Sequence, residues 1–550
     1  LNPEQLAAVT LPPQHALILA GAGSGKTRVL TTRIAWLIST GQCGPHGILA
    51  VTFTNKAAKE MLTRLSAMLP INTRGMWVGT FHGLCNRLLR AHHREAGLPQ
   101  LFQILDQADQ LSAIKRLLKA LNVDDEKYPP REMQHFINAR KEQGERAATV
   151  EAWDGFTRRR VEIYAAYEQQ CQREGVVDFA ELLLRSHELL ERNGVIRRHY
   201  QQRFRHILVD EFQDTNRLQY RWLKLLAGYS AAHESEMASM FAVGDDDQSI
   251  YAFRGADVGN MRDFEREFKV TNVIRLEQNY RSHGNILDAA NAIIKNNAER
   301  LGKNLWTEAG SGEPIRIFEA PGDLDEARWI VEEIKALARD GHARSEIALL
   351  YRSNAQSRVL EHALFNAGLP YRVYGGLRFF ERQEIKHALA YLRLIANADD
   401  DTAFARVVNF PTRGIGARTL EQLADAALAQ QCSLHAAIGY LTGKAHASLS
   451  GFAQLIARMR DGSDGLPLPE VVDHIIALSG LGEHYRNDKE GQDRLENLDE
   501  LINAAASFIA EEGAFETMAT EGGELAAFLA HASLEAGEHQ AGDSDDAVQL

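Results

Sequence analysis

Up to Thr80, apolar residues gather in short runs separated by segments of mixed polarity. A run of consecutive apolar residues is typical of a strand buried on both faces of a parallel sheet. The predicted strands are Ala16–Leu19, Leu49–Phe53 and Trp77–Phe81, and the predicted helices are Arg28–Ser39 and a segment from Lys56. Strands that alternate with helices indicate βαβ units, so we expect an α/β fold with a parallel sheet.

The pattern turns helical from about Arg87 to Tyr200, with apolar residues at helical spacing at Leu111, Ile114, Leu117 and Leu118. Strand signals return at His206–Val209 and Met240–Val243. The simplest account is a helical insertion inside one sheet domain.

A second series of strands is predicted further along the chain, at Val273–Leu276, Ile315–Phe318, Ile347–Tyr351 and Tyr371–Tyr374. From Arg378 onward nearly every segment has a helical pattern. We therefore expect a second α/β unit with its own helical domain. The expected domain boundaries are 1–86 and 206–273 for the first α/β lobe, 87–205 for its helical insertion, 274–376 for the second lobe, and 377–550 for the second helical subdomain.

Composition sets wider limits. The 550 residues are too many for one core, and 45% hydrophobic with 25% charged residues is ordinary for a globular protein. No apolar run approaches the roughly 18 residues that span a bilayer, and the first residues do not resemble a secretion signal. The four cysteines lie far apart without metal-ligand or disulfide-framework spacing. These features predict a cytoplasmic protein without a membrane partner.

The net charge of −13 argues at first sight against a nucleic-acid partner. Phosphate binding depends on local fields rather than on total charge, so the argument is weak. Acidic residues cluster late, at Asp399–Asp401 and between Glu535 and Asp546, whereas basic runs such as Arg158–Arg160 occur earlier. A surface that is basic in one part and acidic in another is compatible with this distribution.

A glycine-rich segment follows the first predicted strand and opens the first predicted helix, Ala20-Gly21-Ala22-Gly23-Ser24-Gly25-Lys26-Thr27. In that context such a loop cradles phosphates, because its backbone N–H groups point into one concavity at a positive helix end. Lys26 would neutralise the β- and γ-phosphates of ATP, and the Thr27 hydroxyl would hold Mg²⁺. The alternative is a flexible Gly/Ser turn, which the preceding strand disfavours.

Two acids end the strand at Ile207–Val209. In a phosphate-loop domain, Asp210 would hold Mg²⁺ opposite Thr27, and Glu211 would orient and deprotonate the attacking water. Taken without the glycine-rich loop, the pair is equally typical of a helix cap.

Polar and aromatic residues follow the strand at Met240–Val243. Gln248 is placed to contact the γ-phosphate, while Tyr251, Phe253 and Arg254 supply two aromatic faces and a cation, which suits stacking of single-stranded bases. The other interpretation makes Tyr251 and Phe253 core residues of a loop.

Further candidates stand at other strand ends, where ligands bind in open α/β sheets. Phe53 and His82 are similar candidates for contact with nucleic acid. Tyr280 and Arg281, after Val273–Leu276, are placed to stack on adenine and to reach the γ-phosphate across a cleft.

Together these blocks resemble the superfamily 1 DNA helicases of the UvrD/Rep/PcrA group, and the resemblance covers nearly the whole chain in order. It is carried by LNPEQ, AGAGSGKTR, AVTFTNKAA, GTFHGL, VDFAELL, ILVDEFQDTN, VGDDDQSIYAFRGA, RLEQNYRS, ALLYRSNAQSR and YGGLRFFERQEIKHALAYLRL. The resemblance implies two RecA-like P-loop lobes, each with an inserted helical subdomain. It also implies ATP-driven 3′→5′ movement along DNA in bacterial nucleotide excision and mismatch repair, with single-stranded and tailed duplex DNA and repair proteins as partners.

Residue by residue, the resemblance implies that Gln5 contacts the adenine and that Arg28 and Tyr280 flank it. The phosphate and metal residues would be Ala22, Gly23, Ser24, Gly25, Lys26, Thr27 and Asp210. Glu211 would be the catalytic base, with Gln248 and Arg281 as γ-phosphate sensors. The single-strand track would be lined by Phe53, Thr80, His82, Tyr251, Phe253 and Arg254.

The chain also departs from the family pattern. Many relatives have Trp where Phe253 stands, and the stretch Tyr229–Met240 is longer than usual, so a surface loop is expected there. Family members continue past the counterpart of Asp546–Leu550 with two further motor blocks, and the first residue here is not Met. We therefore expect an incomplete second lobe.

These departures leave other functions open: a DNA- and nucleotide-binding fragment with little turnover, a nuclease-linked relative, or RNA as the track. Whether the chain acts as a monomer or a dimer is also open.

Overall fold

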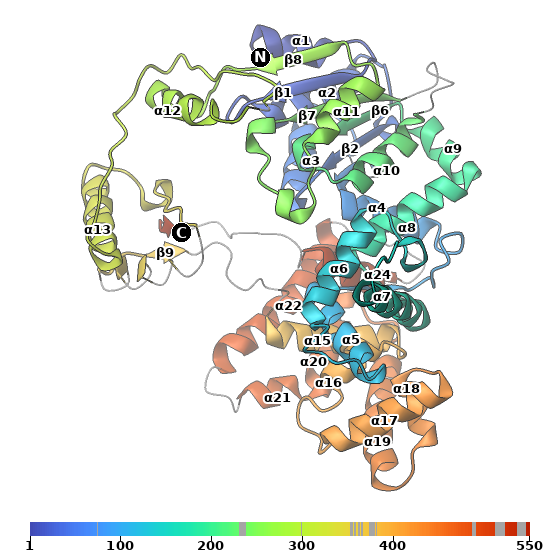
Figure 1. The fold of residues 1–550 in the computed structure, drawn as a ribbon. Coiled ribbons are helices and arrows are strands. Elements are labelled where there is room, and N and C mark those ends of the chain that lie inside the picture. The colour runs from blue at the N-terminus through green and yellow to red at the C-terminus, as the bar shows by residue number, and fades with distance from the viewer. Residues whose placement is uncertain are drawn as a thin grey trace.

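The computed structural model describes residues 1–73, 75–229, 238–298, 300–352, 356, 359–360, 363–364, 367–372, 380, 382–486, 491–511, 523–535 and 546–550. Figure 1 shows a sheet region, a set of helices below it, and a smaller unit at its side that holds the C-terminus. Most of the expected loop at Tyr229–Met240 lies outside the described residues.

The centre of the first region is a six-stranded parallel sheet with the order β3-β2-β6-β7-β1-β8. Its strands are β1 (Ala16–Ala20), β2 (Ile48–Thr52), β3 (Trp77–Thr80), β6 (His206–Val209), β7 (Ser239–Gly244) and β8 (Asn272–Leu276). Successive side chains of a strand point to opposite faces, so each run of apolar residues supplies two cores. The predicted parallel α/β sheet is therefore confirmed.

Helices cover both faces of this sheet (Figure 1). One core lies beneath α1 (Pro3–Thr10), α2 (Lys26–Ser39) and α3 (Asn55–Met68), where Ile18, Ile34 and Met61 are fully buried. The other face packs against α4 (Phe81–Ala91), α8 (Phe179–Arg192), α10 (Arg217–Ala227) and α11 (Gly259–Glu267).

The helical insertion occupies the chain between β3 and β6, as expected. It contains α4 and α8 together with α5 (Gln107–Ala120), α6 (Pro130–Glu142), α7 (Gly155–Glu174) and α9 (Gly194–Arg203). Two features differ from the expectation. Short strands β4 (Gln103–Leu105) and β5 (Val176–Asp178) form a parallel pair that a three-residue pattern does not reveal. The expected boundary after residue 86 falls inside α4, which begins directly after β3 because Thr80 caps its N-terminus.

The segment Val273–Leu276 was expected to open a second sheet, and this expectation was wrong. It lies in β8, which pairs along its whole length with β1 at the edge of the first sheet, from Ala16–Asn272 to Ala20–Leu276. The connection from α11 is only 268–271, so the chain reaches the nearest free sheet edge before it can leave the domain.

The smaller unit contains α13 (Asp323–Arg339) and a parallel pair of β9 (Tyr371–Arg372) and β10 (Val548–Gln549). Its core includes Val331, Ile334 and Val548. The last residues therefore join this unit rather than the helical subdomain expected at 377–550. A strand needs a hydrogen-bonded neighbour, and among the described residues Ile315–Phe318 pairs with none, while Ile347–Tyr351 has a single bridge at Ala348. Residues 373–374 of the expected last strand lie outside the description.

The remaining helices form a separate core around α15 (Gln383–Ala396), whose Ile385, Tyr391 and Leu392 are fully buried. The helices packed around it are α16 (Asp401–Val407), α17 (Ala417–Gln430), α18 (Leu434–Ala437), α19 (Gly443–Ser463), α20 (Leu468–Ser479), α21 (Leu481–Arg486), α22 (Gly491–Glu511) and α24 (Gly523–Glu535). Among the helices described, none has both the length and the apolar character that a membrane crossing requires.

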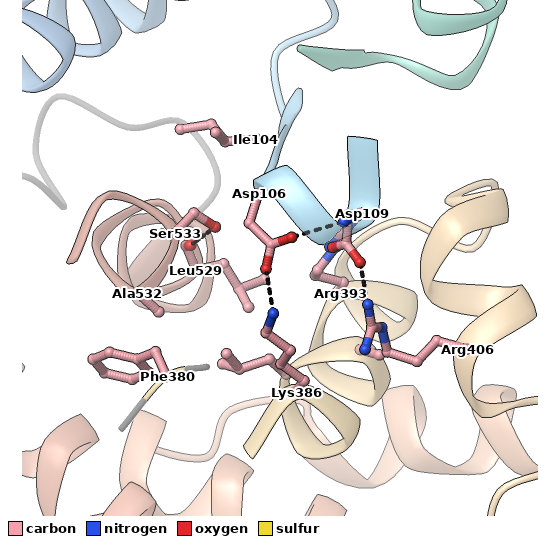
Figure 2. Close-up of a pocket in the computed structure, with 12 residues that line it drawn as sticks. Ile104, Asp106, Asp109, Phe380, Lys386, Arg393, Arg406, Leu529, Ala532 and Ser533 are labelled. Carbon is pink, nitrogen blue, oxygen red and sulfur yellow. Dashed lines mark hydrogen bonds and ion pairs between the residues drawn. The ribbon is translucent and has the colours of Figure 1, made fainter. Parts of the chain in front are cut away.

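A buried ion network joins the insertion to these C-terminal helices (Figure 2). The Asp109 carboxylate on α5 forms ion pairs with Arg393, at 2.5 Å, and with Arg406. Arg393 also forms an ion pair with Asp400 at 2.8 Å. Burial alone would raise the pKa of Asp109, but the two arginines outweigh burial and hold that pKa at about 2. Asp109 is therefore ionised at neutral pH, and the network locks two segments nearly 300 residues apart in sequence.

We expect Arg393→Met to lower the free energy of unfolding by about 3–5 kcal/mol, because Asp109 and Asp400 would lose a buried partner. Urea unfolding followed by circular dichroism measures the change. Lys119→Met is the matched control, since Lys119 also joins α5 to the C-terminal helices through Glu421 but the pair is exposed. Equal effects of the two variants would contradict a special role for the buried network.

Candidate nucleotide-binding and catalytic site

The glycine-rich loop connects β1 to α2 and has the geometry of a phosphate cradle. Gly23 and Gly25 adopt positive φ values of 67° and 85°, which side chains other than glycine rarely tolerate. The Ser24 hydroxyl donates to the Gly21 carbonyl at 2.7 Å and closes the turn. α2 begins at Lys26 without a side-chain cap, so its first backbone N–H groups are available to an anion.

Gln5 and Tyr280 lie beside this loop. Gln5 is buried in the capping box of α1, and its amide donates to the Ser24 carbonyl at 2.8 Å. Asn2 and the Tyr280 hydroxyl both donate to the Gln278 side chain, at 3.1 and 2.9 Å. The structure thus brings Gln5 and Tyr280 together beside the loop. Arg28, exposed on the first turn of α2, lies near Gln5, since a Cβ added to Gly25 would stand 3.0 Å from Gln5 Nε2 and 3.9 Å from the Arg28 Cβ.

Arg281 also lies beside the loop, but it comes from the same sheet and not from across a cleft. The Tyr280 N–H donates to the Gly23 carbonyl at 2.9 Å, and Asn279 donates to the Ala22 carbonyl at 2.6 Å. A Cβ added to Gly23 would stand 2.7 Å from the Arg281 Cβ. The expected position of Arg281 on an opposite lobe was therefore wrong, because β8 belongs to the first sheet.

The carboxylates after β6 meet the loop lysine. Lys26 Nζ lies 2.7 Å from Glu211 Oε2. Glu211 has a positive φ of 46°, a backbone strain that a residue other than glycine stores mainly at functional sites. Burial raises the pKa of Asp210 to about 6, and the negative charge of Glu211 adds to this effect.

Two residues in the same block were not singled out from the sequence. Gln213 is buried, and its amide nitrogen donates to Glu211 at 3.0 Å while its oxygen accepts the Asp245 N–H at 2.9 Å. Asp214 contributes a third carboxylate, and burial raises its pKa to about 6. Their adjacency to Asp210 and Glu211 was the available signal, but the folded turn decides which side chains face inward.

The excess of negative charge at the turn after β6 suits a divalent cation. Asp210, Glu211 and Asp214 share Lys26 as their nearest described cation, so negative charge is in excess, and Asp214 Oδ1 is buried without a hydrogen-bond partner. Carboxylate oxygens are the ligands Mg²⁺ prefers. Asp210 and Thr27 are the residues that would hold the ion.

Gln248 follows β7 in a short helical turn, and its amide donates to the Asp245 carboxylate. The loop beyond it carries Tyr251 and Phe253, which are 38% and 73% exposed, with ring centroids 6.1 Å apart. The alternative interpretation required both rings to be core residues, and neither of them is buried. A Cβ added to Gly255 would stand 2.9 Å from Glu142 Oε2, so α6 of the insertion borders this loop. The Arg254 side chain lies outside the description.

The other candidate nucleic-acid residues are less exposed. Phe53 packs edge-on against Phe81 at 5.5 Å, and Thr80 is buried as the cap of α4. His82 packs against Phe179 at 5.7 Å, and burial lowers its pKa to about 4. His82 is therefore neutral at physiological pH and has no charge to offer a phosphate.

The uncapped glycine-rich turn, its lysine and the facing carboxylates define a P-loop nucleotide-binding protein. Two family profiles match the chain in succession: the UvrD/REP helicase N-terminal domain over residues 1–269, and the UvrD-like helicase C-terminal domain over residues 274–550. The chain belongs to the UvrD/REP helicase family.

Similarity to individual relatives agrees with this assignment. The chain is 52% identical to DNA helicase II of Escherichia coli and 49% identical to that of Haemophilus influenzae, in each case over all of the chain and 76% of the relative. It is 40% identical to the ATP-dependent DNA helicase PcrA of Staphylococcus aureus, over 92% of the chain and 70% of that protein. The resemblance inferred from the motifs is confirmed.

We expect Asp210→Asn to stabilise the nucleotide-free protein, by on the order of 1–3 kcal/mol at pH 8. The folded pKa of Asp210 is raised, so wild-type stability is greatest where this carboxyl is protonated and falls as the pH rises from about 4 through 6. Asparagine cannot ionise, and the gain should therefore shrink towards pH 5. Thermal unfolding at the two pH values measures the gain, with Asp263→Asn, at a partly exposed carboxylate on α11, as control. A gain independent of pH would contradict the raised pKa.

Proposed function

We propose that the chain is an ATP-dependent DNA helicase that moves 3′→5′ along single-stranded DNA and acts in nucleotide excision and mismatch repair. One observation carries the proposal: the Lys26–Glu211 pair and the exposed Tyr251–Phe253 pair stand at the same carboxyl edge of one sheet. Ligands of open parallel sheets bind at that edge. A nucleotide site and a stacking surface on one rigid element are what a DNA-coupled motor requires.

In the proposed mechanism, the N–H groups of the glycine-rich loop and Lys26 bind the ATP phosphates. Lys26 then turns from Glu211 to the phosphates, which frees the Glu211 carboxylate to accept a proton from the water that attacks the γ-phosphorus. Mg²⁺, held by Thr27 and Asp210, supplies neutralisation of phosphate charge when bound. Gln248 and Arg281 contact the γ-phosphate, and Gln5, Arg28 and Tyr280 hold the adenine.

The DNA track is proposed to pass over Phe53, Thr80, His82, Tyr251, Phe253 and Arg254. The bases stack on Tyr251 and Phe253, and the neutral His82 contributes a ring face or a hydrogen bond. Gln213 links the two loops, since its amide contacts Glu211 after β6 and the backbone of Asp245 after β7. A change at the γ-phosphate therefore has a direct route to the aromatic loop.

We propose that the motor is built from two RecA-like lobes. The first comprises the chain through β3 and the chain from β6 through β8, with the helices from α4 to α9 as its insertion. The second comprises the unit built on α13, β9 and β10, with the helices from α15 to α24 as its helical subdomain. Single-stranded and tailed duplex DNA and repair proteins are the proposed partners, in the bacterial cytoplasm near the nucleoid.

We expect Glu211→Gln to lower DNA-stimulated ATP hydrolysis by roughly 10²–10⁴-fold, because an amide cannot accept the proton of the attacking water. Nucleotide affinity should stay near the wild-type value, since Lys26 and the N–H groups of the glycine-rich loop, which bind the phosphates in the proposed mechanism, are unchanged. Steady-state ATPase assays with and without single-stranded DNA, and titration with a fluorescent ATP analogue, measure both. Normal turnover by the variant would remove Glu211 from its role. A wild-type chain that binds both ligands without turnover would favour the binding-fragment alternative.

We expect Phe253→Ala to weaken single-stranded DNA binding by about 1–3 kcal/mol, the typical contribution of one stacked base. Fluorescence anisotropy of a labelled oligonucleotide at fixed salt concentration measures the affinity. Trp153→Ala provides a control because Trp153 is 87% exposed and lies in the insertion just before α7, not in a loop that follows a strand of the sheet. An equal loss in both variants would argue against a dedicated stacking loop.

A further inference from the structure

Three consecutive aspartates, Asp245, Asp246 and Asp247, follow β7, and their carboxylates lie within 4.8 Å of one another. The Lys303 Nζ stands between them, 2.7 Å from Asp245, 2.5 Å from Asp246 and 2.9 Å from Asp247. The Lys303 side chain is only 2% exposed. Its ammonium group fills the position that a metal ion would need, so the cluster is an ion-pair network.

The network is strongly charged and well satisfied. Burial alone would lower the pKa of Lys303, but the aspartates, led by Asp245, outweigh burial and raise it. Arg300 binds the Asp247 carboxylate through two nitrogens at 2.7 and 2.8 Å, and the Leu301 N–H donates to Asp246 at 2.7 Å. Charge-assisted bonds of this kind are about twice as strong as neutral ones, so they hold residues 300–303 firmly against the loop after β7.

Asp245 connects this network to the catalytic site. One carboxylate oxygen of Asp245 pairs with the Lys303 ammonium, and the other accepts a hydrogen bond from the side-chain amide of Gln248. The rotamer of Asp245 therefore sets the direction of the Gln248 amide. Lys303 holds that rotamer together with the Asp247 N–H, which donates to the same Asp245 oxygen at 3.1 Å.

Residues 300–306, which we call the strap, also reach the nucleotide loop. Trp306 exchanges backbone hydrogen bonds with Glu277 and Asn279, directly before Tyr280 and Arg281. A Cβ added to Gly21 would stand 2.1 Å from the Leu305 side chain. The strap thus contacts three sides of the site: the glycine-rich loop, the end of β8 and the acidic turn after β7.

We propose that Lys303 is a positioning residue for ATP hydrolysis, which orients the Gln248 amide through Asp245 and keeps it in register with the Tyr280–Arg281 segment through the strap. The proposal rests on the proposed helicase function. The buried Lys303 ammonium is bound by the three aspartates, so its loss should affect turnover and leave nucleotide binding largely intact.

The test is a double-mutant cycle on the full chain with Lys303→Met, Gln248→Ala and the combined variant. K303M is expected to lower the kcat of DNA-stimulated ATP hydrolysis roughly 10–100-fold, the scale of a misplaced catalytic group, with little change in KM. The combined variant should be no slower than Q248A alone. Lys303→Arg should recover much of the rate, and Lys295→Met, an exposed lysine at the end of α12 (Gly284–Ile294), is the matched control.

Multiplicative effects of K303M and Q248A, or an unchanged kcat in K303M, would overturn the proposal. If K303M alone melts below the assay temperature, K303M/D246N removes one of the facing charges and takes its place in the cycle. Failure of the proposed function looks different: the wild-type chain would lack DNA-stimulated turnover, or Q248A would hydrolyse ATP at the wild-type rate.

Discussion

The parallel direction of the sheet strands is the constraint on which the rest of the structure depends. Because all six strands run the same way, their carboxyl ends meet along one edge. The phosphate loop follows β1, the acids follow β6, the glutamine and aromatic loop follow β7, and the arginine follows β8. Residues spread over more than 250 positions thus become neighbours without any long-range design beyond strand order.

At that edge of the sheet, the negative charges outnumber the positive ones. Three carboxylates face one lysine, and two of the carboxyl groups have a raised pKa because they are buried beside another acid. In the proposed function, a triphosphate with a metal ion would bring both an anion for Lys26 and a cation for the acids. Such binding would replace an unbalanced set of charges with a balanced one, so the same site could be destabilising when empty and specific when filled.

Features formed by residues close together in the sequence could be predicted from it. The loop from Gly21 to Thr27, the acids at Asp210 and Glu211, and the strand–helix alternation all lie within short windows whose geometry is local. Non-local pairing was not readable. The residues Val273–Leu276 do not indicate that their strand pairs with β1. That pairing decides from which side Arg281 approaches the site. Lys303 and Asp109 likewise meet partners far away in sequence, so their roles emerge only from the fold.

β8 is the last strand on its side of the sheet, and the outer edge of a terminal strand invites pairing by another chain. Here the strand is short, its Arg275 is tied to the carbonyls of Leu301 and Gly302, and the backbone just beyond it is taken up by Trp306. The segment that returns along this border therefore also guards it against aggregation. In this structure the border of β8 is therefore a poor template for intermolecular sheet growth.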